Sequence, residues 1–178
     1  MLREMEAEDL TSACAYLGDP EVLRYLDRTT PYSEQQAWMM IYSARKQVFQ
    51  KPRDFYTLAV VIRESAQMIG ECTLTRLYSL EDRNPTGGAT IGFIFNHEYW
   101  NRGYATEAAS ALLQFAFVDL GLENIYGGCH PDNIASRRVL EKLGMKYKLA
   151  EQDFPGSPHG VEAQVFCIGR ESWLARNQ

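Results

Sequence analysis

The middle of the chain carries hydrophobic runs typical of strands. Residues 55–62 are rich in β-branched and aromatic side chains, residues 68–77 form a second such run, and residues 89–95 alternate apolar side chains with small or polar ones. Residues 63–67 and 79–88 separate these runs and together supply serine, asparagine, proline and glycine. The pattern therefore predicts three strands joined by a short turn and a longer polar loop.

Hydrophobic residues at helical spacing precede and follow this region. Ser33 stands before one predicted helix with Gln36 three positions on, the arrangement of a capping box, and Gly144 is expected to end another. The predicted helices span 8–18, 34–51, 104–120 and 134–143, with one or two further turns at 21–26. Further strands are predicted at 1–5, 124–129, 145–153 and 161–169. This order predicts one α/β domain around a mixed sheet.

The loop between the strand 89–96 and the helix 104–120 carries the most distinctive chemistry. It contains Arg102 and Gly103 directly before the helix. The first N–H groups of a helix lack internal partners and mark the positive end of its dipole. Because glycine lets the main chain approach a ligand closely, and arginine adds a charge, this arrangement predicts a site for a pyrophosphate. No G-x-x-x-x-G-K-[ST] sequence is present, which disfavours a nucleotide P-loop.

Composition narrows the possible partners. The chain has 178 residues and a formal net charge of −5 without a long basic run, so nucleic-acid binding is not expected. Its four cysteines are widely separated and form no C-x-x-C pair, so no metal site is expected. No apolar leader or membrane-spanning run is present, and the cytoplasm is the expected compartment.

Two sequence blocks resemble the GCN5-related N-acetyltransferase (GNAT) superfamily, and within it the ribosomal-protein-alanine acetyltransferase-like (RimJ/RimL-type) branch. The first block is EYWNRGYATEAA at 98–109, and the second is HPDNIASRRVLEKLGM at 130–145. In the superfamily the first block is often Q/R-x-x-G-x-G/A. Trp100 takes its first position here, which departs from the general pattern but is usual in that branch. The resemblance implies a mixed, mostly antiparallel central sheet of about six to seven strands flanked by helices, and a single N-acetyltransferase domain over residues 1–178.

The resemblance also implies an activity and a set of site residues. The chain would transfer acetyl from acetyl-CoA to a primary amine by direct attack in a ternary complex. The amine would belong to a protein N-terminus or a small molecule, and a homodimer is plausible for the branch. The pantetheine arm would pair with the main chain of the strand and contact the second block, and the pyrophosphate would lie on the loop. The implied cofactor residues are Phe93, Ile94, Phe95, Arg102, Gly103, Tyr104, Ala105, Thr106, Asn133 and Ser136.

The catalytic groups are less defined by the sequence. Some members of the superfamily carry a glutamate and a tyrosine at the positions that Gly128 and Leu140 occupy here, and neither residue can transfer a proton. Ser136 remains the candidate on the leaving-group side, although Asn133 and Ser136 also fit a plain helix cap. The candidate general bases are Asp153, foremost, and Glu151, His130 and Glu98. The missing pair keeps an alternative open, a non-catalytic CoA-binding sensor or interaction module of the same fold.

Overall fold

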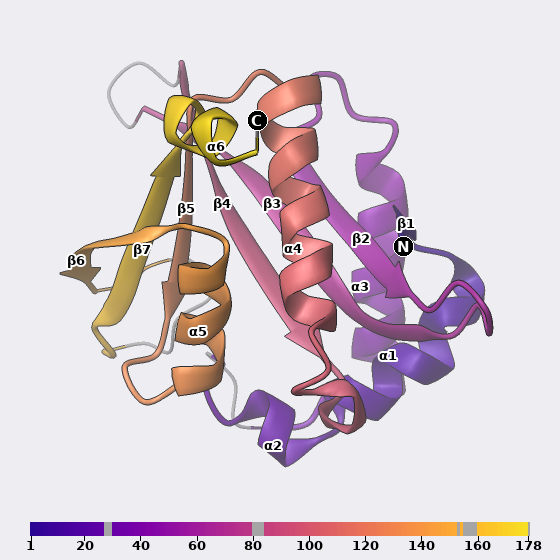
Figure 1. The fold of residues 1–178 in the computed structure, drawn as a ribbon. Helices are drawn as coiled ribbons and strands as arrows, with labels where there is room; N and C mark the ends of the chain where they lie inside the picture. Colours follow the sequence, from indigo (N-terminus) through magenta and orange to yellow (C-terminus); the bar gives the residue numbers. More distant parts are fainter. Residues whose placement is uncertain (27–29, 80–83, 153, 155–159, 178) are drawn as a thin grey trace.

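A seven-stranded sheet organises the chain in the computed structural model, which describes residues 1–26, 30–79, 84–152, 154 and 160–177 (Figure 1). The strand order is β1-β2-β3-β4-β5-β7-β6. Only β4 and β5 pair in parallel, and every other pair is antiparallel. The strands are β1 (Leu2–Glu4), β2 (Phe55–Val61), β3 (Met68–Tyr78), β4 (Pro85–Phe95), β5 (Asn124–Cys129), β6 (Lys146–Glu151) and β7 (Ala163–Gly169). The prediction of a mixed, mostly antiparallel sheet flanked by helices is confirmed.

Helices cover both faces of the sheet (Figure 1). On one face α4 and α5 pack on a core that includes Leu74, Ile91 and Ile125. On the other face α1 and α3 pack on β2 around Tyr16 and Ile41. The helical segments are η1 (Ala7–Asp9), α1 (Leu10–Leu17), α2 (Pro20–Leu23), α3 (Glu34–Gln47), η2 (His97–Tyr99), α4 (Tyr104–Gln114), η3 (Phe115–Asp119), α5 (Ile134–Lys142) and α6 (Arg170–Arg176). Within the described residues, no helix has the length and apolar character needed to cross a membrane.

Local sequence signals explain where α3 begins and where α5 ends. Ser33 accepts a hydrogen bond from the Gln36 main chain at 3.3 Å, and Gln36 reaches back to the Ser33 N–H at 2.9 Å, so the predicted capping box is confirmed. Gly144 has a φ of +84° directly after α5, the left-handed conformation expected of a helix-ending glycine.

Two predicted elements need correction, and one helix was not predicted. Residues 85–88 belong to β4 rather than to a loop, because Pro85 pairs with Tyr78 of β3 and Gly88 with Asn124 of β5. The helix expected over 104–120 changes to a π-helical turn after Gln114, in η3. The C-terminal helix α6 was not predicted. It packs through Trp173, whose ring lies 5.4 Å from that of Phe117.

Candidate functional site

A cleft opens where β4 and β5 separate. Their parallel pairing runs from Gly88–Asn124 to Ile91–Gly127, and the two strands then spread apart toward their carboxyl ends (Figure 1). A cavity of about 290 Å³ lies at this opening. Its walls come from β3, β4, the end of β5, the start of α5 and the segment after α2. The gap gives an extended ligand access to free main-chain groups of β4.

The first turn of α4 forms one end of this region. Gly103 has a φ of +85°, and a Cβ placed there would have no atom within 4 Å. The first intrahelical hydrogen bond joins the Glu107 N–H to the Gly103 carbonyl at 3.0 Å, so the N–H groups of Tyr104, Ala105 and Thr106 precede the helical ladder. An anion would suit this turn for three reasons. The space around Gly103 is open, three N–H groups have no partner within the helix, and the helix dipole is positive at this end.

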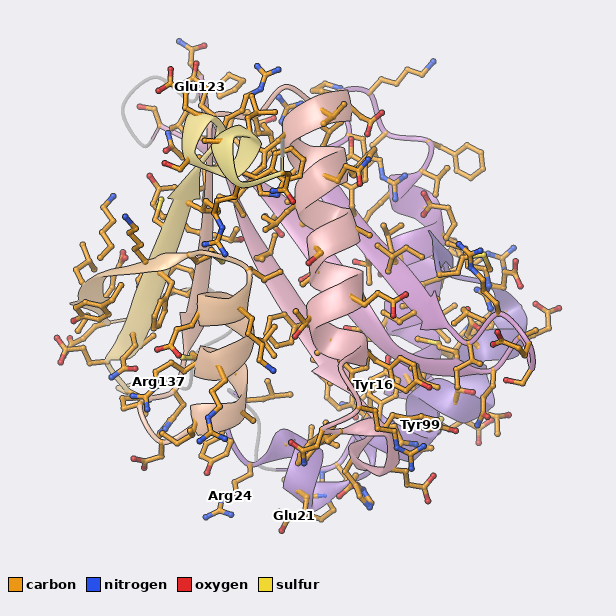
Figure 2. All side chains as sticks on the ribbon, viewed as in Figure 1. Tyr16, Glu21, Arg24, Tyr99, Glu123 and Arg137 are labelled. Carbon is orange, nitrogen blue, oxygen red and sulfur yellow. The ribbon has the colours of Figure 1, made fainter. Side chains whose placement is uncertain are left out.

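Arg102 lies at the surface beside this turn. Its guanidinium carbon stands 5.6 Å from the ring centroid of Tyr99, which is labelled near the start of α4 in Figure 2. Stacking on an aromatic face leaves the guanidinium N–H groups at its edge available for a phosphate. Arg102 can therefore add charge to the site.

Trp100 has a structural role that its sequence position did not reveal. Its indole Nε1 donates a hydrogen bond of 2.8 Å to the carbonyl oxygen of Phe95. This bond ties the loop to the end of β4 and supplies a partner to a carbonyl beyond the β4–β5 pairing. The tryptophan therefore positions the loop that precedes the first turn of α4.

The main chain of β4 presents only alternate residues to the cleft. The Asn96 N–H donates to Ile69 at 3.0 Å, and in antiparallel pairs hydrogen-bonded positions alternate. The pairs Ile94–Glu71 and Gly92–Thr73 are consequently the ones that bond to β3. The polar groups of Phe93 and Phe95 face the open side. Of the three residues expected to pair with a pantetheine arm, Ile94 therefore has its main chain committed to β3.

The second sequence block brings Asn133 and Ser136 to the opposite wall of the cavity. The Asn133 side-chain oxygen accepts a hydrogen bond from the Ser136 N–H at 3.0 Å, so Asn133 caps α5. This bond uses the amide oxygen of Asn133 and the main chain of Ser136. The amide nitrogen of Asn133 and the hydroxyl of Ser136 are not consumed by the cap, so capping and ligand contact are compatible.

The structure describes three of the four residues expected to act as a base. Glu98 and Glu151 are exposed and do not line the cavity, and Asp153 lies outside the described residues. His130 does line it, with its ring 5.2 Å from that of Tyr25. Its Nδ1 accepts the Asp132 N–H at 3.1 Å. That hydrogen bond occupies the lone pair of Nδ1.

The two positions where some members of the superfamily carry a glutamate and a tyrosine are occupied by packing residues in this chain. A Cβ on Gly128 would lie 2.3 Å from the ring of Phe154, so this aromatic side chain fills the space that an acid would need. Leu140 is 1% exposed and packs against Gly127 in the core. Both positions are thus built for packing.

Sequence reasoning missed one acid that does face the cavity. Glu71 of β3 is 4% exposed, and its Oε2 accepts a hydrogen bond of 2.8 Å from the hydroxyl of Tyr16 on α1. Burial raises the pKa of the Glu71 carboxyl, and the hydrogen bond from Tyr16 opposes part of that rise. The available signal was an acid inside an otherwise apolar strand, since glutamate is almost never buried without a partner.

The cleft between the separating strands and the open turn at the start of α4 give this α/β domain a site that suits a long phosphate-bearing ligand beside a buried acid. The comparisons with known proteins identify its family. The model of the acetyltransferase (GNAT) domain matches residues 1–146. The chain therefore belongs to the GNAT acetyltransferase family, and it is an N-acetyltransferase.

Relatives and solved structures agree with this assignment. The uncharacterized N-acetyltransferase YnaD of Bacillus subtilis is 29% identical over 174 residues, covering 97% of this chain and 95% of that protein. A GNAT-family acetyltransferase from Bacillus anthracis has a TM-score of 0.78 at 23% identity, covering 96% of this chain and 94% of the other. Mycobacterium smegmatis RimJ, solved with CoA-disulfide, has a TM-score of 0.77 at 16% identity, with 99% and 88% covered. The ribosomal-protein acetyltransferase type is thus among the structural neighbours.

Proposed function

We propose that residues 1–178 form one N-acetyltransferase domain that transfers acetyl from acetyl-CoA to a primary amine by direct attack within a ternary complex. The observation that carries the proposal is the start of α4, where Gly103 opens an unobstructed turn beside the free edge of β4. Acetyl-CoA supplies the activated acyl group as a thioester. The chain's own residues bind it, orient it and manage protons.

The proposed donor site follows the cleft from the helix start to the second block. Arg102 and Gly103, with the N–H groups of Tyr104, Ala105 and Thr106, would hold the pyrophosphate. Phe93 and Phe95 would offer main-chain groups to the pantetheine arm. Asn133 would donate from its amide nitrogen on the other side, and Ser136 would lie near the sulfur as a proton donor. An N–H near Phe95 would polarise the thioester carbonyl as an oxyanion donor.

The cavity favours direct transfer over a covalent acyl-enzyme. Cys129 is a thiol that lines it, and burial raises the pKa of this thiol to about 11. A thiol with such a pKa is protonated at neutral pH, and the thiolate is the nucleophilic form. Transfer without an enzyme-bound acyl group is therefore the simpler chemistry. Its kinetic signature is a sequential rather than a ping-pong pattern.

Calorimetry and thiol release test the proposal together. Acetyl-CoA is titrated into the purified protein, and release of the CoA thiol is then followed with glucosamine, spermidine and an alanine-initiated peptide as acceptors. Binding with amine-dependent thiol release supports the enzyme. Binding without release for every amine would favour the non-catalytic sensor, and absence of binding would refute the donor site.

A further inference from the structure

We propose that Glu71, positioned by Tyr16, binds the ammonium group of the acceptor and accepts its proton. This inference deepens the proposed function and rests on it. Nothing in the sequence blocks shared with the family assigns a role to this residue, which lies on β3 and outside both blocks. Its geometry places the carboxylate in the wall of the cavity, on a strand adjacent to the one that offers its edge to the donor.

The surroundings of Glu71 call for a cation. Its hydrogen-bonding neighbour from α1 is Tyr16, while the paired positions on β2 and β4 are the apolar Ala59 and Ile94. Across the cavity the titratable groups are Tyr25, Cys129 and His130. In the described part of the chain, no ion pair includes Glu71. A buried carboxylate without a cation is costly, and a ligand ammonium would remove that cost.

The strand around Glu71 also indicates the class of acceptor. Thr73 and Thr75 follow Glu71 at alternate positions of β3, and Thr90 of β4 pairs with Thr75. The three threonine side chains therefore lie on the same face of the sheet as Glu71, and all three line the cavity. Gly92 lies opposite Thr73, and a Cβ there would come within 2.7 Å of the threonine hydroxyl. A small primary amine that carries hydroxyl groups would match one carboxylate beside a row of hydroxyls.

The proton transfer balances without a further reagent. The acceptor enters as an ammonium, and its first proton passes to a carboxylate oxygen of Glu71. The freed amine nitrogen forms a bond to the thioester carbonyl carbon, and the carbon–sulfur bond breaks. The second amine proton leaves with the sulfur as the CoA thiol, through Ser136 or water. Glu71 then returns its proton to solvent through the cavity opening.

The pKa shift of Glu71 suits this role. Burial raises the pKa of the Glu71 carboxyl, and a general base works best when its pKa is close to the pH of the reaction. The hydrogen bond from Tyr16 stabilises the ionised carboxylate and opposes part of this rise. Tyr16 is itself buried, and burial raises the pKa of its phenol well above the usual value. It therefore remains a hydrogen-bond donor and acts as a positioning residue.

A first experiment needs no turnover. The protein is labelled with ¹³C at its glutamate carboxyls, the Glu71 signal is assigned by Glu71→Gln, and ethanolammonium chloride is titrated in the presence of CoA. We expect a saturable shift of the Glu71 signal, and no shift with ethylene glycol, which lacks the charge. Tyr16→Phe should move the titration of the Glu71 signal to higher pH. An unmoved Glu71 signal in a protein that binds CoA normally would refute the proposal.

A second experiment measures catalysis with the best amine of the panel. Glu71→Gln should lower kcat/KM by roughly 10²- to 10³-fold, as for loss of a general base, and remove the acidic limb of the pH profile. Glu64→Gln, in the exposed turn between β2 and β3, is the matched control and should retain wild-type kinetics. An unchanged pH profile in Glu71→Gln would overturn the assignment. If no amine is acetylated while ethanolammonium still shifts Glu71, the proposed transfer fails and the ammonium site stands.

Discussion

Replacing Gly103 separates two contributions of the start of α4 to donor binding, the shape of the turn and the positive potential at the proposed phosphate site. Alanine at this position must adopt a φ near +85°, which costs about 1–2 kcal/mol for a residue with a Cβ. No neighbouring atom lies within 4 Å of that Cβ, so steric collision adds nothing. Gly103→Ala and Gly103→Glu should therefore lose similar stability, roughly 2–8 °C in Tm for a chain of this size.

Only the glutamate variant adds a negative charge to the proposed phosphate site. Two unit charges about 5 Å apart repel by roughly 1–3 kcal/mol at effective dielectric constants of about 80 to 20. That repulsion corresponds to a rise in the Kd for CoA of about 5- to 150-fold beyond any loss in Gly103→Ala. The difference should shrink at high salt, because exposed charges are screened.

The assay is calorimetric titration of CoA into both variants at two salt concentrations, with thermal unfolding as a check on folding. Equal losses of affinity in Gly103→Ala and Gly103→Glu would show that the turn matters through its shape alone. Wild-type affinity in Gly103→Glu would refute the pyrophosphate assignment, since the added carboxylate would then lie away from the ligand.

Four further outcomes test other parts of the site. Ser136→Ala should reduce kcat more than it weakens CoA binding, and equal losses would mean that the serine only positions the donor. Asn133→Asp keeps the cap acceptor but removes the amide donor, so Tm should hold while the Kd for CoA rises; an unchanged Kd would leave capping as its role. Trp100→Phe loses the bond to the Phe95 carbonyl, about 1 kcal/mol, which chemical unfolding and CoA titration can measure. Because burial raises the Glu71 pKa, wild-type stability should fall as pH rises above 4.5 until the folded-state pKa is passed; Glu71→Gln should lack that fall in urea unfolding at pH 4–8.

Most strands and helices followed from periodicity because their burial patterns repeat locally. The start of β4 could not be predicted in this way, because residues 85–88 have the composition of a turn. Their pairing with β3 and β5 makes them part of the strand despite that composition. The helix α6 spans only seven residues. Its Trp173 packs against Phe117 of the π-helical turn, a tertiary interaction that local sequence does not report.

The candidate site also has a part that local sequence predicts, the loop before α4, and a part that only tertiary contacts reveal, the surroundings of Glu71. The loop before α4 was predictable because its signal, an arginine and a glycine directly before a helix, is contained in a few consecutive residues. The role of Glu71 was not, because its partner Tyr16 lies 55 positions away in the chain. Only the docking of α1 on the sheet reveals that the face carrying Glu71 is covered at one end and open at the other.

Gly128 and the proposed role of Glu71 together imply that the carboxylate that takes the amine proton need not keep one position within this fold. The cleft has β5 on one side and β4 with its neighbour β3 on the other. An acceptor nitrogen held in the cleft can therefore meet a carboxylate from either side. On the β5 side, the Phe154 ring leaves no room for a side chain at residue 128. On the other side, β3 carries a buried carboxylate oriented by Tyr16. The chemistry requires a proton acceptor beside the amine, and in the mechanism that we propose Glu71 would meet that requirement from the opposite wall. The missing glutamate at 128 is therefore weak support for a non-catalytic module.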